Sequence, residues 1–310
     1  IKKRGKYNSL ESPLSVYEMH LGSWFRNSES PDKFLNYTDI AKKLVPYIKY
    51  MGFTHVEFMP VMEFPYDPSW GYQITGFFAA TSRFGSPQDL MFLINELHKN
   101  DIGVILDWVP SHFPGDANGL YRFDGSFLYE HEDPRKGFHP DWKSYIFNYG
   151  RNEVKSFLIS NAMFWLDRYH ADGLRVDAVT SMLHLDYSRN EGEWEPNIYG
   201  ENVNLEAKLF LQEFNTAVFE EFGTDVFTVA EESSDFPLLT KPVKDDGVGF
   251  TMKWMMGWMH DTLDYFKEEP VHRKYHHHKL TFASVYMFNE KYMMPLSHDE
   301  VVHGKASLVY

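Results

Sequence analysis

The sequence predicts an α/β fold, specifically a (β/α)8 TIM barrel. Short runs rich in β-branched and apolar residues alternate with longer segments of helical periodicity, and repeated strand–helix units form a parallel sheet. Polar residues stand at the ends of four predicted strands, and the longest loops leave from those ends, where barrels of this class carry their sites. A doubly wound sheet would instead place a glycine-rich phosphate loop after its first strand, and His20-Leu-Gly-Ser-Trp24 is not such a loop.

Seven strands are predicted, bounded by turn residues. In chain order they span residues 14–21, 54–61, 103–109, 173–179, 226–231, 249–254 and 292–296. The third is nearly all apolar, as expected of a strand buried on both faces. We expect the eighth strand of the barrel beyond Tyr310, so the barrel is incomplete within this chain.

Helices are predicted between the strands. They span residues 37–51, 87–100, 152–169 and 205–222, with a further helix around 260–268. Gly52 stands where a C-terminal cap belongs, while Ser86 and Pro87 suit the cap and first position of the second helix. The segment 280–288 fits either helix or strand.

The domain organisation follows from the strand and loop pattern. Residues 1–310 are predicted to be one barrel with long loop excursions at 110–150 and 181–202, and loops of that size are unusual unless they are functional. The chain opens on Ile1 and a basic stretch, Lys2-Lys3-Arg4, so we expect it to begin inside a longer polypeptide.

Composition limits the possible partners. With 310 residues, 43% of them hydrophobic, the chain can build one large core. A net charge of −14 argues against nucleic acid or an anionic membrane as a partner. No apolar run is long enough to span a bilayer. The absence of cysteine rules out a disulfide framework and thiolate metal sites, and it is compatible with the cytoplasmic location that we predict.

The fourth predicted strand carries three charges, at Asp172, Arg175 and Asp177. Because side chains alternate along a strand, Arg175 and Asp177 face the same way, opposite to Leu174 and Val176. An arginine at that spacing keeps an aspartate ionised and oriented. On this stretch alone, a structural ion pair that caps the strand explains the pattern equally well.

Other strand ends carry similar residues, and together they fit one reaction. They are Asp107 and His112 after the third strand, Arg175 and Asp177 on the fourth, Glu231 on the fifth, and His298 and Asp299 after the seventh. Carboxylates, histidines and an arginine, without cysteine or a phosphate loop, suggest glycosyl chemistry, in which one carboxylate attacks the anomeric carbon while a protonated one delivers a proton to the leaving oxygen. Loop aromatics offer stacking faces for sugar rings, although each alone is more often packing: Trp70, Tyr72, Trp108, Trp142 and Trp194.

These motifs resemble the four ordered sequence regions of the α-amylase clan. The regions are Asp107-Trp-Val-Pro-Ser-His112, Asp172-Gly-Leu-Arg-Val-Asp177, Ala230-Glu-Glu-Ser233 and Leu296-Ser-His-Asp-Glu-Val-Val-His-Gly-Lys305. More narrowly, the chain resembles the 1,4-α-glucan (glycogen) branching enzymes. That likeness rests on Tyr17-Glu-Met-His-Leu-Gly-Ser-Trp24, Ser69-Trp-Gly-Tyr-Gln73, Gly192-Glu-Trp194, Gly257-Trp-Met-His-Asp-Thr-Leu-Asp-Tyr265 and the long 297–305 run.

The resemblance implies a retaining transfer of an α-1,4-glucan segment to a sugar 6-hydroxyl, giving an α-1,6 branch. Asp177 is then the nucleophile and remains ionised beside Arg175. Glu231 is the general acid and base, with its pKa raised by burial and nearby carboxylates, and Asp299 binds hydroxyls of the reacting sugar and helps to distort it. The implied substrate-binding residues are Tyr72, Asp107, His112, Arg175 and His298. The two main carboxyl groups are expected about 5–5.5 Å apart.

The resemblance also implies that no cofactor is used, that the protein is a monomer, and that the family's N-terminal carbohydrate-binding and C-terminal β-sandwich domains lie outside this chain. Many α-amylases have a calcium-ligating asparagine where Ser111 stands, so we expect no metal there. Glu201-Asn-Val203 departs from the Gly-Gly-x-Glu-Asn pattern of the branching enzymes, which leaves the detail of that loop open.

Three further patterns have ordinary explanations. His272 with His276-His-His278 fits a polar helix face or turn better than a metal site. The spacing of His298 and His303 is wrong for a zinc helix. The methionines of 252–259 are expected to fill the core. Two other functions stay open: an α-glucan hydrolase of the same clan, and a glucan-binding protein with an inactive site.

Overall fold

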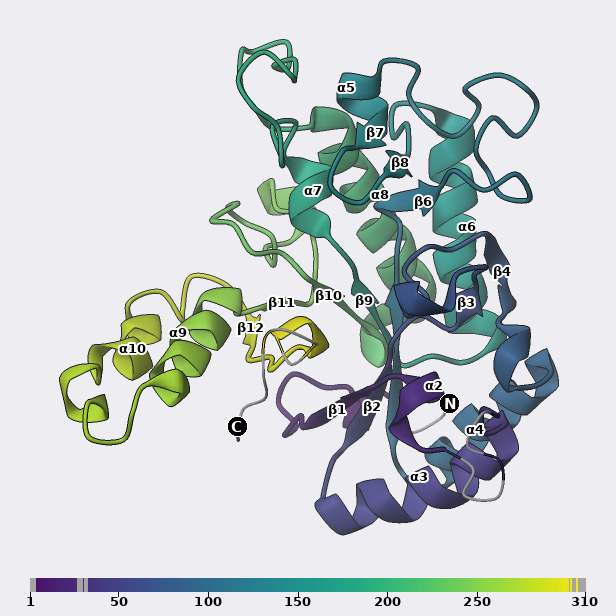
Figure 1. Cartoon of the computed structure of the whole chain (residues 1–310), viewed down its shortest axis with the longest axis vertical. Coiled ribbons are helices and arrows are strands. Elements are labelled where there is room, and N and C mark those ends of the chain that lie inside the picture. The colour runs from purple at the N-terminus through teal and green to yellow at the C-terminus, as the bar shows by residue number, and fades with distance from the viewer. Residues whose placement is uncertain (1–3, 27–29, 31–32, 301, 303–304, 306–310) are drawn as a thin grey trace.

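The structure is a computed structural model that describes residues 4–26, 30, 33–300, 302 and 305. Its centre is a parallel sheet with strand order β1-β2-β5-β9-β10-β11-β12, which curls as one side of a barrel (Figure 1). The strands are β1 (Val16–Met19), β2 (His55–Phe58), β5 (Gly103–Trp108), β9 (Gly173–Val176), β10 (Phe227–Ala230), β11 (Met252–Trp254) and β12 (Tyr292–Met293). All seven predicted strands are therefore present, and each is shorter than predicted.

The long helices between residues 37 and 222 cover the outer face of the sheet, whereas the helices that follow residue 255 project away from it (Figure 1). The α-helices are α1 (Arg4–Tyr7), α2 (Leu21–Trp24), α3 (Tyr37–Met51), α4 (Pro87–Lys99), α5 (Pro134–Gly137), α6 (Asn152–Arg168), α7 (Val179–Leu183), α8 (Leu205–Phe222), α9 (Met256–Lys267) and α10 (His278–Thr281). The short 3-10 helices are η1 (Asp67–Ser69), η2 (Ser82–Phe84), η3 (Gly223–Asp225), η4 (Val243–Asp245), η5 (Arg273–Tyr275), η6 (Phe282–Val285) and η7 (His298–Glu300).

The predicted helix ends are confirmed where capping residues marked them. Gly52 ends α3 in the left-handed conformation, with φ of 80°, and its N–H bonds to the Ile48 carbonyl. Ser86 caps α4 in a reciprocal capping box with Asp89. The ambiguous segment 280–288 is helical, as part of α10 and η6. α9 begins four residues before its predicted start, at Met256.

Alternation along β5 separates two sides of the sheet. Val104 and Leu106 join the large core under the helices, while Ile105 joins a smaller cluster inside the barrel with Phe227 and Trp254. Trp108, predicted as a loop aromatic, is the last residue of β5 and belongs to the outer core, where its indole N–H donates to Asn161 at 2.8 Å. Trp108 is therefore packing rather than a surface for sugar. The expected core role of the methionines is confirmed for Met252, Met255 and Met259, which are buried.

The excursion at 110–150 has secondary structure of its own. It contains a three-stranded antiparallel sheet of β6 (His112–Pro114), β8 (Ser144–Ile146) and β7 (Phe138–His139), together with α5. A second small sheet pairs β3 (Met62–Glu63) with β4 (Gly76–Ala80). Both additions lie beyond the carboxyl ends of the central strands, so they form walls above the sheet.

The edges of the curled sheet, β1 and β12, face a cavity of about 870 Å³. Val16, Glu57, Phe227, Trp254 and Met293 are among the residues that line it. At the carboxyl end of the sheet, a bond between Glu18 and His298 connects the β1 strand to the segment after β12. No helix of the described residues is long and apolar enough to cross a membrane.

Asp172 lies at the amino end of β9, far from the loops at the carboxyl ends, and holds that end of the sheet together. Its carboxylate accepts bonds from His98 (2.7 Å), the Val104 backbone N–H (2.7 Å) and Arg4 (3.0 Å). Burial raises its pKa, but the bonds from His98 and the charge of Arg4 outweigh burial and lower the pKa to about 2. These contacts give Asp172 a structural role.

We expect Asp172→Asn to lower the free energy of unfolding by about 2–3 kcal/mol at pH 7. The folded-state pKa lies below that of the unfolded chain, so the contribution is complete above about pH 4 and is lost as pH falls towards 2. Urea unfolding at pH 7 and pH 3 measures the difference. A deficit of the same size at both pH values would contradict this account.

Candidate active site

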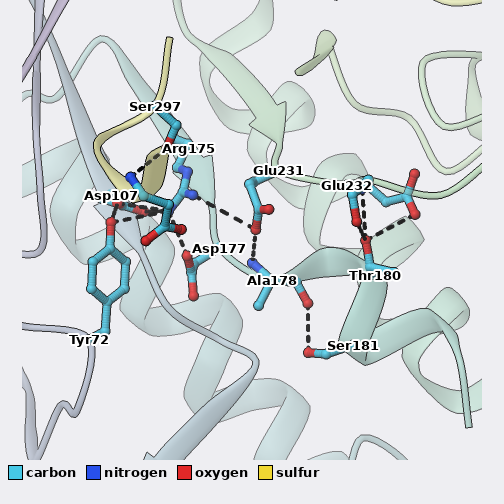
Figure 2. Close-up of polar contacts among 12 residues, drawn as sticks. Tyr72, Asp107, Arg175, Asp177, Ala178, Thr180, Ser181, Glu231, Glu232 and Ser297 are labelled. Atoms are coloured by element: carbon cyan, nitrogen blue, oxygen red, sulfur yellow. Dashed lines mark hydrogen bonds and ion pairs between the residues drawn. The ribbon is translucent and has the colours of Figure 1, made fainter. Parts of the chain in front are cut away.

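Arg175 is the centre of a buried cluster at the carboxyl ends of β5, β9 and β10 (Figure 2). Its Nη1 donates to Asp107 Oδ1 at 2.6 Å and to Asp177 Oδ1 at 2.6 Å, and its Nη2 lies 3.8 Å from Glu231 Oε2. The guanidinium also lies 4.4 Å from the ring centre of Trp254. Its side chain is only 1% exposed, and the side chains of Asp107, Asp177 and Glu231 that face it are 0%, 12% and 18% exposed.

Strand register places these groups. Asp107 on β5 is the direct partner of Arg175 on β9, and Val176 is the partner of Ala230 on β10. The residues that follow continue the pairing: Asp177 donates its N–H to the Trp108 carbonyl at 2.9 Å, and Glu231 donates to the Val176 carbonyl at 3.0 Å. Neighbouring parallel strands thus present their terminal side chains to the same side.

The fourth strand ends at Val176 instead of the predicted residue 179, because the chain turns sharply at Ala178. Ala178 has a φ of 54°, in the left-handed region, and α7 begins with the next residue. This turn aims the Ala178 N–H at Glu231 Oε2, at 2.6 Å, while the Val179 N–H bonds to the Glu231 carbonyl at 3.0 Å. The segments of Asp177 and Glu231 are therefore bonded directly to each other.

The pKa values of both carboxyl groups are raised, whereas the resemblance implied a raised pKa for Glu231 and an Asp177 that stays ionised beside Arg175. Burial raises the pKa of Asp177 to about 7, against the opposing charge of Arg175, and Asp107 adds to the rise. Burial likewise raises the pKa of Glu231 to about 7, again opposed by Arg175 and increased by Asp177. Because Arg175 is closer to Asp177 (2.6 Å) than to Glu231 (3.8 Å), the shared negative charge is favoured on Asp177 and the proton on Glu231.

Tyr72 and His298 lie together beside this cluster. The Tyr72 hydroxyl donates to Asp107 Oδ2 at 2.5 Å, and its ring stacks on the imidazole of His298 with ring centres 5.5 Å apart. Glu18 on β1 contacts both His298 Nδ1 (2.7 Å) and the His298 backbone N–H (2.8 Å). Burial lowers the pKa of His298, but these contacts with Glu18 outweigh burial and raise it.

His112 lies on β6 at the wall formed by the first excursion. It is 4% exposed, and burial lowers its pKa to about 4, so the ring is neutral at pH 7. Trp142 packs against it with ring centres 5.2 Å apart, and His139 lies edge-on at 6.3 Å. A neutral imidazole beside an indole can both donate a hydrogen bond to a sugar hydroxyl and adjoin a stacking face.

Asp299 lies at the rim of the cluster instead of within it. Its side chain is 63% exposed, and its nearest charged neighbour is His298, with Nε2 3.4 Å from Oδ1. Its charge nevertheless contributes to the raised pKa of Asp177 and of Glu231, which places it within electrostatic reach of both. The eight predicted site residues thus lie at one end of the sheet, with six in or beside the cluster, His112 at the wall of the first excursion and Asp299 at the solvent edge.

Among the described residues, no group of three or more histidine, aspartate or glutamate side chains is arranged so that it could hold a metal ion. The histidines of 276–278 lie around the short helices η5 and α10, and His276 contacts Glu268 at 3.7 Å. His303, the second histidine of the pair whose spacing was compared with a zinc helix, lies outside the described residues.

Several polar residues of this region were not predicted. Glu18 was quoted only as part of a motif, and Glu57, which is buried with one carboxyl oxygen lacking a partner, was not singled out. Burial raises the pKa of Glu57 well above its usual value, and the charge of Glu18 adds to the rise. Glu232 and Lys253 form a buried ion pair next to Glu231. The sequence signal for these residues was a charge inside an apolar strand or beside Glu231.

Comparison with known proteins agrees with this geometry. A family model described as "Alpha amylase, catalytic domain" matches residues 24–139 and 138–303. Two solved structures share the fold at 22% identity: an α-amylase from Geobacillus thermoleovorans complexed with acarbose (TM-score 0.60, 82% of this chain and 54% of that one) and a putative α-amylase from Salmonella typhimurium (TM-score 0.67, 93% and 48%).

Curated relatives are much closer in sequence. The chain is 61% identical over 309 residues to proteins named 1,4-alpha-glucan branching enzyme GlgB from Albidiferax ferrireducens and from Aquifex aeolicus, covering 100% of this chain and 49% of each relative. It thus spans about half the length of the curated relatives it matches. Because the family model covers most of the chain and the solved structures share its fold, the chain belongs to the α-amylase catalytic-domain family.

Proposed function

We propose that this chain forms most of the catalytic barrel of a 1,4-α-glucan branching enzyme. The observation that carries the proposal is the pair of carboxyl groups, Asp177 and the partly buried Glu231, that face the same guanidinium of Arg175. A retaining glycosyl transfer needs one ionised and one protonated carboxyl group in the same site. The relatives named as branching enzymes at 61% identity support this choice of acceptor chemistry.

In the proposed first step, Asp177 attacks the anomeric carbon of an α-1,4-glucan while Glu231 gives its proton to the departing glycosidic oxygen. An ester then joins Asp177 to the donor segment. In the second step Glu231, now a carboxylate, removes the proton from a sugar 6-hydroxyl, whose oxygen displaces Asp177. The product is an α-1,6 branch with the original anomeric configuration.

The surrounding residues are proposed to hold the sugar in that reaction. Arg175 keeps the charge on Asp177, while Tyr72 and Asp107 form the wall beside it. His298 and the neutral His112 offer hydrogen bonds to hydroxyls from two sides. Asp299, which is exposed at the rim, is proposed to bind hydroxyls of an entering ring.

Iodine staining and reducing-end assays on amylose separate branching from hydrolysis. Branching shortens the outer chains and lowers iodine colour while creating few new reducing ends, because each cleaved bond is replaced by an α-1,6 bond. Treatment of the product with a debranching enzyme should then release short chains. A rise in reducing ends that matches the loss of colour would instead identify a hydrolase. No change in either signal would favour an inactive glucan-binding protein.

The pH dependence of transfer is expected to follow the proton on Glu231. With its pKa raised to about 7, activity should fall as pH rises through about 7, because the general acid loses its proton. Initial rates between pH 5 and 9 test this, and Glu231→Gln should remove the basic limb along with most of the activity. A rate that stays flat up to pH 9 would contradict the assignment.

The proposed setting is a cytoplasmic, monomeric enzyme acting on glycogen or amylose-like chains without a cofactor. The lack of cysteine fits a reducing compartment, and the net charge of −14 disfavours nucleic acid while leaving a neutral glucan unaffected.

A further inference from the structure

Glu232 follows the proposed acid directly in the chain but faces the opposite way. Its side chain is 0% exposed and forms an ion pair with Lys253 of β11, with Nζ 2.5 Å from Oε2. The Lys253 side chain is only 6% exposed. The neighbours of Lys253 on β11, Met252 and Trp254, belong to the cluster inside the barrel, so the lysine extends to the other side of the sheet.

This ion pair connects three segments. Glu232 Oε1 accepts a bond from the Thr180 hydroxyl (3.1 Å), on the helix that follows Asp177, and from the Ser234 N–H (2.9 Å) (Figure 2). Lys253 donates a second bond, at 2.8 Å, to the Ser234 carbonyl. The Ser233 N–H also bonds to the Thr180 hydroxyl at 2.8 Å. The segments of nucleophile and acid are therefore fixed to each other and to β11 behind the reacting groups.

We propose that Lys253 is a positioning residue for Glu231 and acts through Glu232. The inference rests on the proposed function, in which Glu231 must deliver a proton to one oxygen atom. The Glu231 carboxyl group is oriented by a 2.6 Å bond from Ala178, which holds only while the two segments keep their alignment. Removing the lysine leaves Glu232 buried without its cation, so the segment 231–234 shifts to reach solvent or other donors. A displacement of about 1 Å costs on the order of 10²-fold in rate.

Lys253→Met, made in the full-length enzyme, tests the proposal with two donors. On amylose, kcat should fall about 30- to 100-fold while KM changes less than about 3-fold. An α-maltooligosyl fluoride needs little help from an acid, because fluoride leaves without full protonation. Its fluoride release in a single turnover, which reports only attack by Asp177, should therefore fall less than about 3-fold. Equal losses on both donors, or no loss on amylose, would overturn the proposal.

Two further variants separate positioning from stability. Arg4→Met removes a cation from another buried ion pair, with Asp172 at 3.0 Å, at the opposite end of the sheet. It should lower the melting temperature while leaving the ratio of amylose to fluoride rates unchanged. The double variant Glu232→Leu with Lys253→Met has no unpaired charge, so it should fold more stably than Lys253→Met alone. Its ratio should remain low, because Glu232→Leu removes the carboxylate that accepts from Thr180 and Ser234, and Lys253→Met removes the bond to the Ser234 carbonyl. A restored ratio would count against the proposal.

Failure of the positioning role of Lys253 can be told apart from failure of the proposed branching function. If the unmodified enzyme shows no branching of amylose, the proposed function fails on that measurement alone. If the unmodified enzyme branches amylose and the ratio of the two donor rates is the same in Lys253→Met, only the positioning role fails.

Discussion

Replacing Asp177 with asparagine should lower glucan transfer by a factor on the order of 10⁴ or more, because an amide cannot form the ester intermediate. The substitution keeps the size of the side chain and leaves a carbonyl oxygen to accept the bond from Arg175, now 2.6 Å from Asp177. Binding should therefore survive while kcat is lost. Initial rates on amylose and the affinity for a short maltooligosaccharide measure the two effects.

Asp172→Asn provides the matched control, since both aspartates flank the same short strand and both are buried. At the amino end, the substitution should cost stability and leave the rate constants of the folded protein close to those of the unmodified enzyme. At the carboxyl end, Asp177→Asn should instead lower the rate of glucan transfer. If Asp177→Asn kept transfer within about 10-fold of the original rate, another group would have to be the nucleophile.

The elements most accurately predicted were the long helices, and local chemistry sets the ends of three of them. The bounds of α3 and α8 agree with the sequence prediction, and α4 differs by one residue at its end. Asn36, Ser86 and Asn204 cap these three helices through bonds to a backbone N–H three residues later. Such contacts depend on a few neighbouring residues, so the sequence alone reveals them.

Strand ends were less accurate because long-range contacts decide them. The fourth strand was extended through residue 179 on its apolar alternation, yet Ala178 turns left-handed to bond with Glu231, 53 residues away. Nothing in the local sequence of Ala178 signals a positive φ. The rise in the pKa of Asp177 was missed for a related reason: the arginine beside it was visible in sequence, but its burial with Asp107 was not.

The candidate site shows the same difference between residues that the fold alone positions and residues whose role depends on distant contacts. Residues at the carboxyl ends of strands were predicted, because the fold brings all such ends together. Glu18 was not singled out, since its partner His298 is 280 residues away and lies across the open side of the sheet. Lys253 was hidden within an apolar stretch, where its burial opposite Glu232 depends on which face of β11 it occupies.

The buried charges of the site are mutually dependent. Arg175 faces Asp107 and Asp177 directly, with Glu231 farther away, so three acidic groups rely on one cation. Burial is the main reason that Glu231 keeps a proton near neutral pH, and the ionised Asp177 raises its pKa further. Arg175 therefore sets both the stability of the cluster and its state of protonation.

Arg175→Met should lower the free energy of unfolding by about 3–5 kcal/mol at neutral pH, because it leaves Asp107 and Asp177 buried without their cation. Without the arginine, both carboxyl groups favour the neutral form in the folded protein, so their folded-state pKa values rise further above those of the unfolded chain. The loss should then grow as pH rises from 6 to 9, through the pKa of about 7 that Asp177 has beside Arg175. Urea unfolding of both proteins across that range measures it.

Arg175→Lys separates charge from geometry at the same position. A lysine retains the positive charge but has one ammonium group in place of the planar fork, so it cannot contact both aspartates as the guanidinium does. It should recover part of the lost stability and little of the activity, because the charge on Asp177 would no longer be fixed in place. A loss in Arg175→Met that is independent of pH would mean that its contacts with Trp254 and other neighbours, rather than its charge, hold this end of the sheet together.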